Sequence, residues 1–200
     1  MSRIRANTIT NKAATGAPTF SNGAVVTGVC TATSFAGSGA ALTGISAGLF
    51  SSYAIITHEK SNNTHGSSLS NSSYATRELN TEVADPDNIV SVSGNHFTLQ
   101  AGSYLIESMS IIHRGNQSQS RLYNVTDSSV DGVGMAVMTS SSFASQTVST
   151  LVNRITISGA KAFEIQHQCQ TSHSTYGLGL HHGISGANSI YTIVEIYKES

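Results

Sequence analysis

Apolar and polar residues alternate over two runs that flank a tight turn, within His96–His113. Before the turn, Phe97-Thr98-Leu99 alternates with a period of two. After the turn Gln100-Ala101-Gly102, one face of the next run holds Tyr104, Ile106, Ser108, Ser110 and Ile112. This period predicts two β-strands, and the aromatic and β-branched residues fit a packed sheet surface. Gly102 provides the backbone freedom that the turn needs.

The same alternation recurs through the rest of residues 51–200 and predicts an all-β domain. The predicted strands are 53–58, 89–99, 104–113, 121–125, 133–138, 147–157, 161–169 and 190–197, with a short edge-like strand at 74–83. No stretch indicates a helix of three turns. About eight short strands separated by turns predict a closed or two-sheet β structure.

The connections between the predicted strands differ in length. The long connections are 60–72, 114–120, 139–145 and 170–189, whereas 100–102, 127–131 and 158–160 are short turns. Because each strand of an antiparallel fold reverses direction, successive connections alternate between its two ends. We therefore expect the long polar loops at one end, with the short turns and both domain termini at the other; the strand at 74–83 could shift the first loop.

Loops on a rigid scaffold are where binding residues concentrate. The candidate binding residues are therefore those of the long loops: Arg114, Asn116, Gln117, Ser141, Phe143, His173, Tyr176, His181 and His182. Tyr176, near His173, is the aromatic residue that we expect to make contacts, because aromatic rings carry much of the energy of interfaces. The alternative is that these loops only cap the molecule.

Residues 1–50 differ from the rest of the chain. They contain Arg3, Arg5 and Lys12 but no acidic residue, and all 11 acidic residues follow later. Their apolar residues are too sparse to offset an ordering cost of about 1–2 kcal/mol per residue. Either this segment is flexible, or identical copies intertwine, which its small residues and repeated cadence favour. We predict an attachment and stalk segment at 1–50 and a knob domain at 51–200.

Composition excludes several classes of protein. Only 10% of the residues are charged and the net charge is -1, so a basic surface for nucleic acid is not expected. No run approaches the roughly 18 apolar residues of a membrane span, and no apolar run follows the basic start as in a signal peptide. Cys30 and Cys169 are predicted to be free thiols in a reducing cytoplasm.

The sequence does not predict an enzyme. Gly44-Ile-Ser46-Ala-Gly48 matches the nucleophile-elbow pattern but lacks the strand before it and the helix after it. The closest carboxylate pairs, Asp85 with Asp87 and Glu78 with Glu82, are sequence neighbours. A glycosidase needs two acids that face each other about 5–9.5 Å apart across a cleft. Asp85 and Asp87 fit a turn more simply.

Five segments resemble the complement-globular/tumour-necrosis-factor type of jelly roll found at the tips of bacteriophage fibres. They are Leu79–Val83, Phe97–Glu107, Arg121–Asp127, Phe163–Cys169 and Tyr191–Lys198. The resemblance covers about residues 53–199. It implies an antiparallel jelly roll of eight to ten strands, packed as a homotrimer about a threefold axis.

Residues 1–50 are similar to stalk repeats of tail-fibre and other virion proteins, notably those of marine phages. The similarity lies in Thr15–Phe20 and Ala32–Ile45. It implies a virion fibre, assembled in the host cytoplasm, that contacts other virion proteins through residues 1–50 and a host surface glycan or protein through the knob. The alternatives are a purely structural virion component (a head fibre, decoration or fibre adaptor) and a polysaccharide depolymerase.

A threefold axis could also bring together three copies of one histidine as metal ligands. The weak candidates are His181, His182 and His167, which lies two residues before Cys169. The alternative is that these histidines make hydrogen bonds in loops and between subunits. No Cys-x-x-Cys or His-Glu-x-x-His motif is present, so we expect neither a metal nor a cofactor.

Overall fold

The computed structural model describes residues 9, 12, 13, 15, 16, 20, 22–31, 48–184 and 186–200. The chain divides into two units, Met1–Ile45 and Ser46–Ser200. In the first unit, Val25 and Val29 are 94% and 91% exposed in the single chain. The stalk repeat at 32–45 and residues 44–47 of the Gly-x-Ser-x-Gly motif lie outside the described residues. The attachment and stalk roles of residues 1–50 stay predictions.

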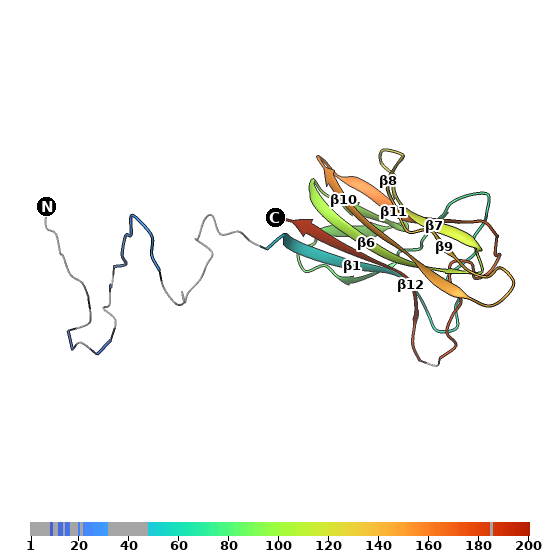
Figure 1. The fold of residues 1–200 in the computed structure, drawn as a ribbon, viewed down its shortest axis with the longest axis horizontal. Helices are drawn as coiled ribbons and strands as arrows, with labels where there is room; N and C mark the ends of the chain where they lie inside the picture. Colours follow the sequence, from blue (N-terminus) through green and yellow to red (C-terminus); the bar gives the residue numbers. More distant parts are fainter. Residues whose placement is uncertain are drawn as a thin grey trace. The chain divides into compact units, whose positions relative to one another are not determined.

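The second unit consists of two antiparallel sheets (Figure 1). The five-stranded sheet has the order β10 (Gln146–Ile157), β6 (Gly102–His113), β12 (Ser189–Glu199), β1 (Phe50–Lys60), β3 (Thr81–Ala84). The seven-stranded sheet has the order β4 (Val90–Ser93), β5 (His96–Leu99), β11 (Lys161–Cys169), β7 (Gln117–Asn124), β8 (Ser129–Val133). Its two remaining strands are short: β2 (Ala75–Thr76) pairs with β11, and β9 (Val137–Met138) pairs with β7.

The order of the strands is that of a jelly roll. Strands that follow one another in sequence mostly lie in opposite sheets: β5 is followed by β6 in the other sheet, β6 by β7, and β10 by β11. As a result β6 lies between β10 and β12, and β11 lies between β5 and β7. Such interleaving of two packed sheets defines the jelly roll. The predicted fold class is therefore confirmed, with ten strands longer than two residues in the described part of the chain.

Two predicted strands are divided in the structure. The prediction of one interrupted strand at 89–99 is wrong, because β4 and β5 form a hairpin there. Gly94 and Asn95 have φ values of 60° and 69°, as a two-residue type I′ turn requires. The segment 74–83 forms β2 and the start of β3, which pair with different sheets.

Two predicted boundaries are also wrong. The strand expected at 133–138 is mostly replaced by β8 at 129–133, because a tight turn with Ser128 at φ 55° ends the β7–β8 connection early. The loop expected at 114–120 is only three residues long, since β7 begins at Gln117. Gln117 therefore belongs to a strand.

The interior has an apolar part and a polar part. The apolar core includes Phe97, Tyr104, Ile106, Leu122 and Phe163, each with 0% exposure, and the Phe97 and Phe163 rings stack 5.7 Å apart. Further along the strands, away from Phe50, a layer of buried polar residues crosses the sandwich. We define this polar layer as His58, Thr192, Ser110 and Ser149 of the five-stranded sheet with Ser120 and His167 of the seven-stranded sheet. Ser120 Oγ and Ser149 Oγ, 2.8 Å apart, link the two sheets.

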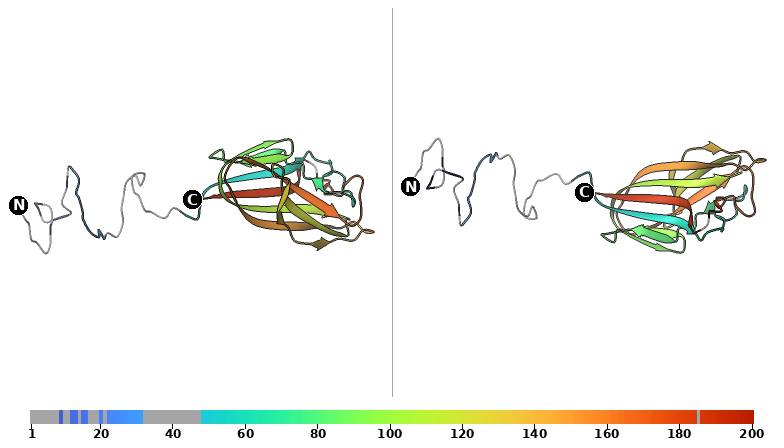
Figure 2. Two further views of the ribbon diagram at one scale, coloured as in Figure 1. Left: turned by 90° about the horizontal axis from the view of Figure 1, so that it is seen from above. Right: turned by 90° about the horizontal axis from the view of Figure 1, so that it is seen from below.

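The two ends of the sandwich differ as the loop lengths predicted. At one end, the proximal end, Phe50 pairs with Glu199 and Gly102 pairs with Ile157, so the knob termini and the turn at 158–160 lie there. Figure 2 shows β1 and β12 side by side from two directions. The longer loops lie at the opposite, distal end (Figure 1).

Candidate functional site

Backbone hydrogen bonds tie four connections into one distal surface. We define this distal surface as residues 61–74, 114–116, 139–145 and 170–188. Leu69 and His173 each donate their backbone N–H to the other's carbonyl at 2.8 Å. Thr139 N donates to Asn116 O at 3.0 Å, and Gln170 N donates to Gly115 O at 3.1 Å. The four connections therefore hold one another in place.

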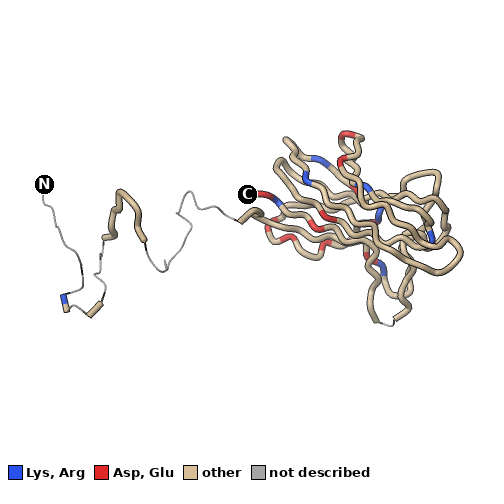
Figure 3. Tube along the Cα trace, in the orientation of Figure 1, with Lys and Arg blue, Asp and Glu red and all other residues tan. Residues whose placement is uncertain are grey.

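The distal surface is polar but almost uncharged. Arg114 is the only Asp, Glu, Lys or Arg in the sequence of its four segments. In Figure 3 most acidic positions lie in the half of the knob that carries the C-terminus. The distal surface therefore suits a ligand that is recognised by hydrogen bonds and aromatic contacts rather than by charge.

A cluster of aromatic rings lies beneath this surface. We define the distal cluster as His65, His113, His173, Tyr176 and His181. Tyr176 is in the middle: its ring centroid lies 3.7 Å from that of His173, 4.9 Å from His113 and 5.0 Å from His65. The His65 and His181 rings are 4.6 Å apart. The structure thus joins three predicted residues, His173, Tyr176 and His181, with two that the sequence analysis missed.

Three histidines of the distal cluster have a lowered pKa. Burial lowers the pKa of His113, and the charges of His173, Arg114 and His65 lower it further. Burial, and to a lesser extent the charges of Arg114 and His65, lower the pKa of His173. Burial, and to a lesser extent the charge of His181, lower the pKa of His65. Protonation would place like charges within a few ångströms of each other, which is unfavourable in a partly buried site. The rings of His65, His113 and His173 therefore favour the uncharged form.

Other candidate residues have structural roles at the distal surface. The Arg114 guanidinium donates to the carbonyl of Ser141 through Nε at 3.0 Å and Nη2 at 2.9 Å, which fixes the 139–145 loop. Asn116 Nδ2 donates to Gln170 Oε1 at 2.6 Å. Phe143 is 76% exposed, and His182 is exposed too. Phe143, His182 and Gln117 are therefore the exposed residues among the predicted binding residues.

A buried arginine, Arg77, binds the backbone of the last distal connection, residues 170–188. Arg77 is completely buried, and its guanidinium donates to Leu178 O at 2.8 Å, to Ile111 O and to His167 Nδ1 at 2.7 Å. No ion pair of Arg77 with a carboxylate occurs among the described residues. Burial lowers its pKa to about 9, so it is still protonated at pH 7. Arg77 thus fixes the loop through carbonyl groups.

The weak metal candidates are not brought together. His167 is buried in the polar layer, and burial together with the charge of Arg77 holds its pKa well below the ordinary value. A ring that is buried within one chain and bonded to Arg77 is not exposed to a subunit axis, so the structure gives no support to His167 as a ligand there. The suggestion for His181 and His182 stays a prediction. Within the described ranges, no group of three His, Cys, Asp or Glu residues is arranged to hold a metal ion.

The carboxylates considered for hydrolysis make structural contacts. Asp85 accepts the backbone N–H groups of Ile89 and Val90, both at 2.9 Å, which shapes the turn before β4. Asp87 accepts a hydrogen bond from Ser52 Oγ at 2.5 Å. Burial raises the pKa of Glu78, but hydrogen bonds from Lys60 and Ser67 outweigh this and lower the pKa overall.

Both thiols are free, as predicted: Cys30 is exposed and Cys169 is buried. Burial raises the pKa of the Cys169 thiol. Its Sγ donates to Thr171 O at 3.1 Å, so this thiol helps to hold the chain at the end of β11.

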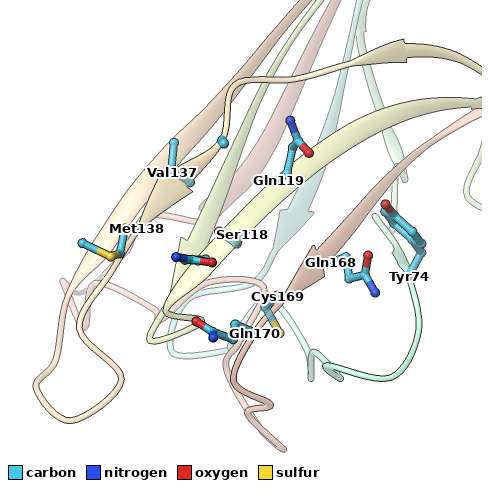
Figure 4. Close-up of a pocket in the computed structure, with 10 residues that line it drawn as sticks. Tyr74, Ser118, Gln119, Val137, Met138, Gln168, Cys169 and Gln170 are labelled. Carbon is cyan, nitrogen blue, oxygen red and sulfur yellow. The ribbon is translucent and has the colours of Figure 1, made fainter.

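A groove of about 560 Å³ lies on the seven-stranded sheet near the distal surface. Figure 4 shows Tyr74 on one side of it and Val137 and Met138 on the other. Gln119 and Gln168, which are cross-strand partners on β7 and β11, lie between these sides. Of the residues that line this groove, only Gln117 was among the predicted binding residues.

Comparisons with known proteins find only distant similarities, and those are to solved structures. No family model matches the sequence, and the comparison with curated proteins also finds no match. Among solved structures, the globular domain of a zebrafish complement 1qA protein is 12% identical with a TM-score of 0.47, covering 73% of this chain and 95% of its own.

Two further structures are similar at the same level. Murine APRIL is 10% identical with a TM-score of 0.48, covering 74% of this chain and 98% of its own. The PRD1 vertex protein P5 is 16% identical with a TM-score of 0.45, covering 76% of this chain and 99% of its own. The assignment of the jelly roll rests on the strand order described above. Within the described ranges, no helix is long and apolar enough to cross a membrane.

Proposed function

We propose that the chain is a trimeric virion fibre protein whose knob binds the surface of a host cell through its distal surface. The observation that carries this proposal is the gathering of four polar connections at the end opposite the knob termini. A stalk joined at Phe50 would leave that distal surface free for contact. The stalk-like sequence of residues 1–50, which we propose attaches to other virion proteins, supports the assignment to a virion.

The five-stranded sheet supports the trimer. Its outer face exposes apolar side chains on three strands: Tyr53 on β1, Met109 on β6, and Val148 and Val152 on β10. Val152 alone is 60% exposed. Exposed apolar residues gathered on one face of a soluble domain indicate an interaction surface. Packing of this face against other copies would cover these residues and leave the distal surface open.

The mass of the purified chain and its binding to cells test this proposal together. Light scattering should give about three times the chain mass of 20.9 kDa at micromolar concentration. Fluorescently labelled protein should bind a subset of a panel of bacterial strains. Phe143→Ala should weaken that binding because Phe143 is exposed on the distal surface, whereas Val83→Ala, an exposed change on β3, should not.

Two outcomes would contradict the proposal. A monomeric mass would exclude the trimer. A trimer that binds none of the strains would instead favour a purely structural virion component. The double variant His173→Ala/Tyr176→Ala is a weaker test, because both rings pack in the distal cluster and their loss would also disturb the loops.

A further inference from the structure

We propose that the groove between Tyr74 and β9 is a binding subsite for a neutral saccharide, an inference that rests on the proposed function. Its volume of about 560 Å³ falls within the range of roughly 300–1,000 Å³ that is usual for small-molecule sites. It lies on the seven-stranded sheet, so the outer face of the five-stranded sheet can pack against other copies without covering it.

The sides of the groove are apolar and aromatic. Val137 and Met138 of β9 form one side, and Met138 is 71% exposed. Tyr74 stands at the other side (Figure 4). A pyranose ring has C–H groups on its faces and hydroxyl groups around its edge. Tyrosine combines an apolar ring face with a polar hydroxyl group, and it therefore matches the face and edge of a sugar.

Amide side chains form the polar part of the groove. Gln117, Gln119, Gln168 and Gln170 all line it. Gln119 Nε2 donates to Gly134 O at 2.8 Å and Gln170 Oε1 accepts from Asn116, so these two side chains are fixed. Gln117 and Gln168 make no side-chain hydrogen bond to any described residue. An amide both donates and accepts, as a hydroxyl does, so these two can bind sugar hydroxyl groups.

The main chain under the groove is already paired, which disfavours a peptide ligand. Ser118 pairs with Cys169 of β11 on one side and with Val137 of β9 on the other. Gln168 pairs with Gln119, and the far edge of β11 pairs with β2 through Gln166 and His167. A peptide that binds by strand addition needs free backbone groups at a sheet edge. Recognition in this groove must therefore come from side chains.

The absence of charge selects a neutral ligand. None of the residues that line the groove is Asp, Glu, Lys or Arg. An anionic ligand would lose hydration in the groove, and the cation beside it, Arg121, is already stacked on Tyr74 and bonded to Gln166. The neighbouring distal surface has only Arg114, whose guanidinium is bonded to the carbonyls of Ser141 and Ser142. A longer saccharide could therefore extend from the groove onto that surface without meeting a free charge.

The tyrosine is held in place before a ligand binds. Arg121 Cζ lies 3.3 Å from the centroid of the Tyr74 ring, a cation–π contact. Arg121 Nε donates to Gln166 Oε1 at 2.6 Å, and Gln166 Nε2 in turn donates to Glu164 Oε1. This chain of contacts orients Arg121 and hence Tyr74. A side chain that is already ordered loses less entropy when the ligand binds.

The test uses polysaccharide from a strain that the full-length protein binds. Its surface polysaccharides are separated into a neutral and an acidic fraction, and each is titrated into the protein by calorimetry. The neutral fraction should bind and the acidic fraction should not. Tyr74→Ala should weaken binding about tenfold through the lost ring contact, and Gln168→Glu should weaken it because the new carboxylate is a charge without a partner.

The matched control is Gln100→Glu, the same change in charge at an exposed residue of the turn between β5 and β6. It should bind as the wild type does, and all three variants should keep the wild-type mass and melting temperature. Binding of only the acidic fraction, or unchanged binding by both groove variants, would overturn the subsite. Cell binding that persists in those variants would leave the proposed function intact, whereas a wild type that binds no strain would reject the proposed function itself.

Discussion

The two halves of the knob interior are packed with different kinds of side chain. Toward the proximal end, inward positions hold Ile106 on β6 and Phe163 on β11. Toward the distal end, the same strands place Ser110 and His167 inward, and both are completely buried. One set of continuous strands thus passes from an apolar core into a polar layer. The apolar half resembles the core of most domains. In the polar layer, side-chain hydrogen bonds join Ser120 to Ser149 and Arg77 to His167, while His58, Ser110 and Thr192 have buried polar atoms without a partner among the described residues.

The two halves therefore contribute differently: the apolar half to the stability of the fold, and the polar half to the conformation of the distal loops. Burial of apolar groups is the dominant favourable contribution to folding and does not depend on protonation. Hydrogen bonds add less to the free energy of folding, but they are directional. The apolar half therefore fixes the strands, and the polar half determines how the distal loops are held. Changes in the two halves should have effects of different size and different pH dependence.

The largest effect should come from the apolar core. Phe97→Ala removes a completely buried ring that stacks on Phe163, and it should lower the free energy of unfolding by about 3–5 kcal/mol. Urea unfolding at fixed protein concentration measures this. Phe143→Ala, the same change at an exposed position, should stay within about 0.5 kcal/mol of the wild type. Similar losses in both variants would contradict the location of the core.

The next effect is a loss of stability in acid that originates in the distal half. Burial, followed by the charge of Arg77, lowers the pKa of His58 to about 4. The unfolded chain, with a histidine pKa near 6.5, binds this proton first. The free energy of unfolding should therefore be constant above about pH 7 and fall as the pH drops through 6.5 toward 4, by on the order of 3 kcal/mol for His58 alone. His65, His113, His167 and His173 should add to the same trend.

The matched variant for the pH effect is His58→Leu. Both ring nitrogens of His58 are buried without a hydrogen-bond partner in the described part of the chain. An apolar side chain avoids that cost, so the variant should be at least as stable as the wild type at pH 7. Its stability should also fall less between pH 6.5 and 4.5. A wild type with equal stability at pH 7.5 and 4.5 would contradict the assignment of buried neutral histidines.

A smaller effect should follow from Arg77→Met. This change removes a buried cation but leaves the carbonyls of Leu178 and Ile111 without their donor, and it should cost about 1–3 kcal/mol. Because Leu178 lies in the last loop, amide hydrogen exchange should increase there more than in the apolar core. Unchanged exchange in residues 176–180 would show that Arg77 does not hold this loop.

The fold could be predicted where strands are long and alternate regularly. The predicted bounds of β11 match the structure. Those of β10 differ by one residue at its start, and those of β12 by one residue at its start and two at its end. The strand predictions that failed lie where the backbone conformation of one or two residues determines whether the chain turns. The Gly94–Asn95 pair, with two positive φ values, makes a hairpin that was taken for an interruption, although a Gly-Asn pair is itself a known signal for such a turn.

The candidate site could be predicted only in part. Loop lengths placed the long loops at one end, and the structure brings His173, Tyr176 and His181 together there. His65 and His113 were missed because they come from a polar loop and from the end of a strand, and only tertiary packing joins them. Arg77 was missed because nothing in its sequence neighbourhood marks it as buried.

The pairing of β1 has a mechanical consequence. The chain enters the knob at Phe50, and β1 pairs with β12 from Phe50 opposite Glu199 to Lys60 opposite Ser189. Tension between residue 50 and the distal loops would act along the axis of β1, so its hydrogen bonds to β12 and β3 would be loaded together in shear instead of being opened one by one. Forced unfolding is governed by the unfolding rate, and that rate is slow when many backbone hydrogen bonds must break at the same time. Ser200 donates its N–H to Leu49 O, which adds one more hydrogen bond beside the first pair of β1 and β12.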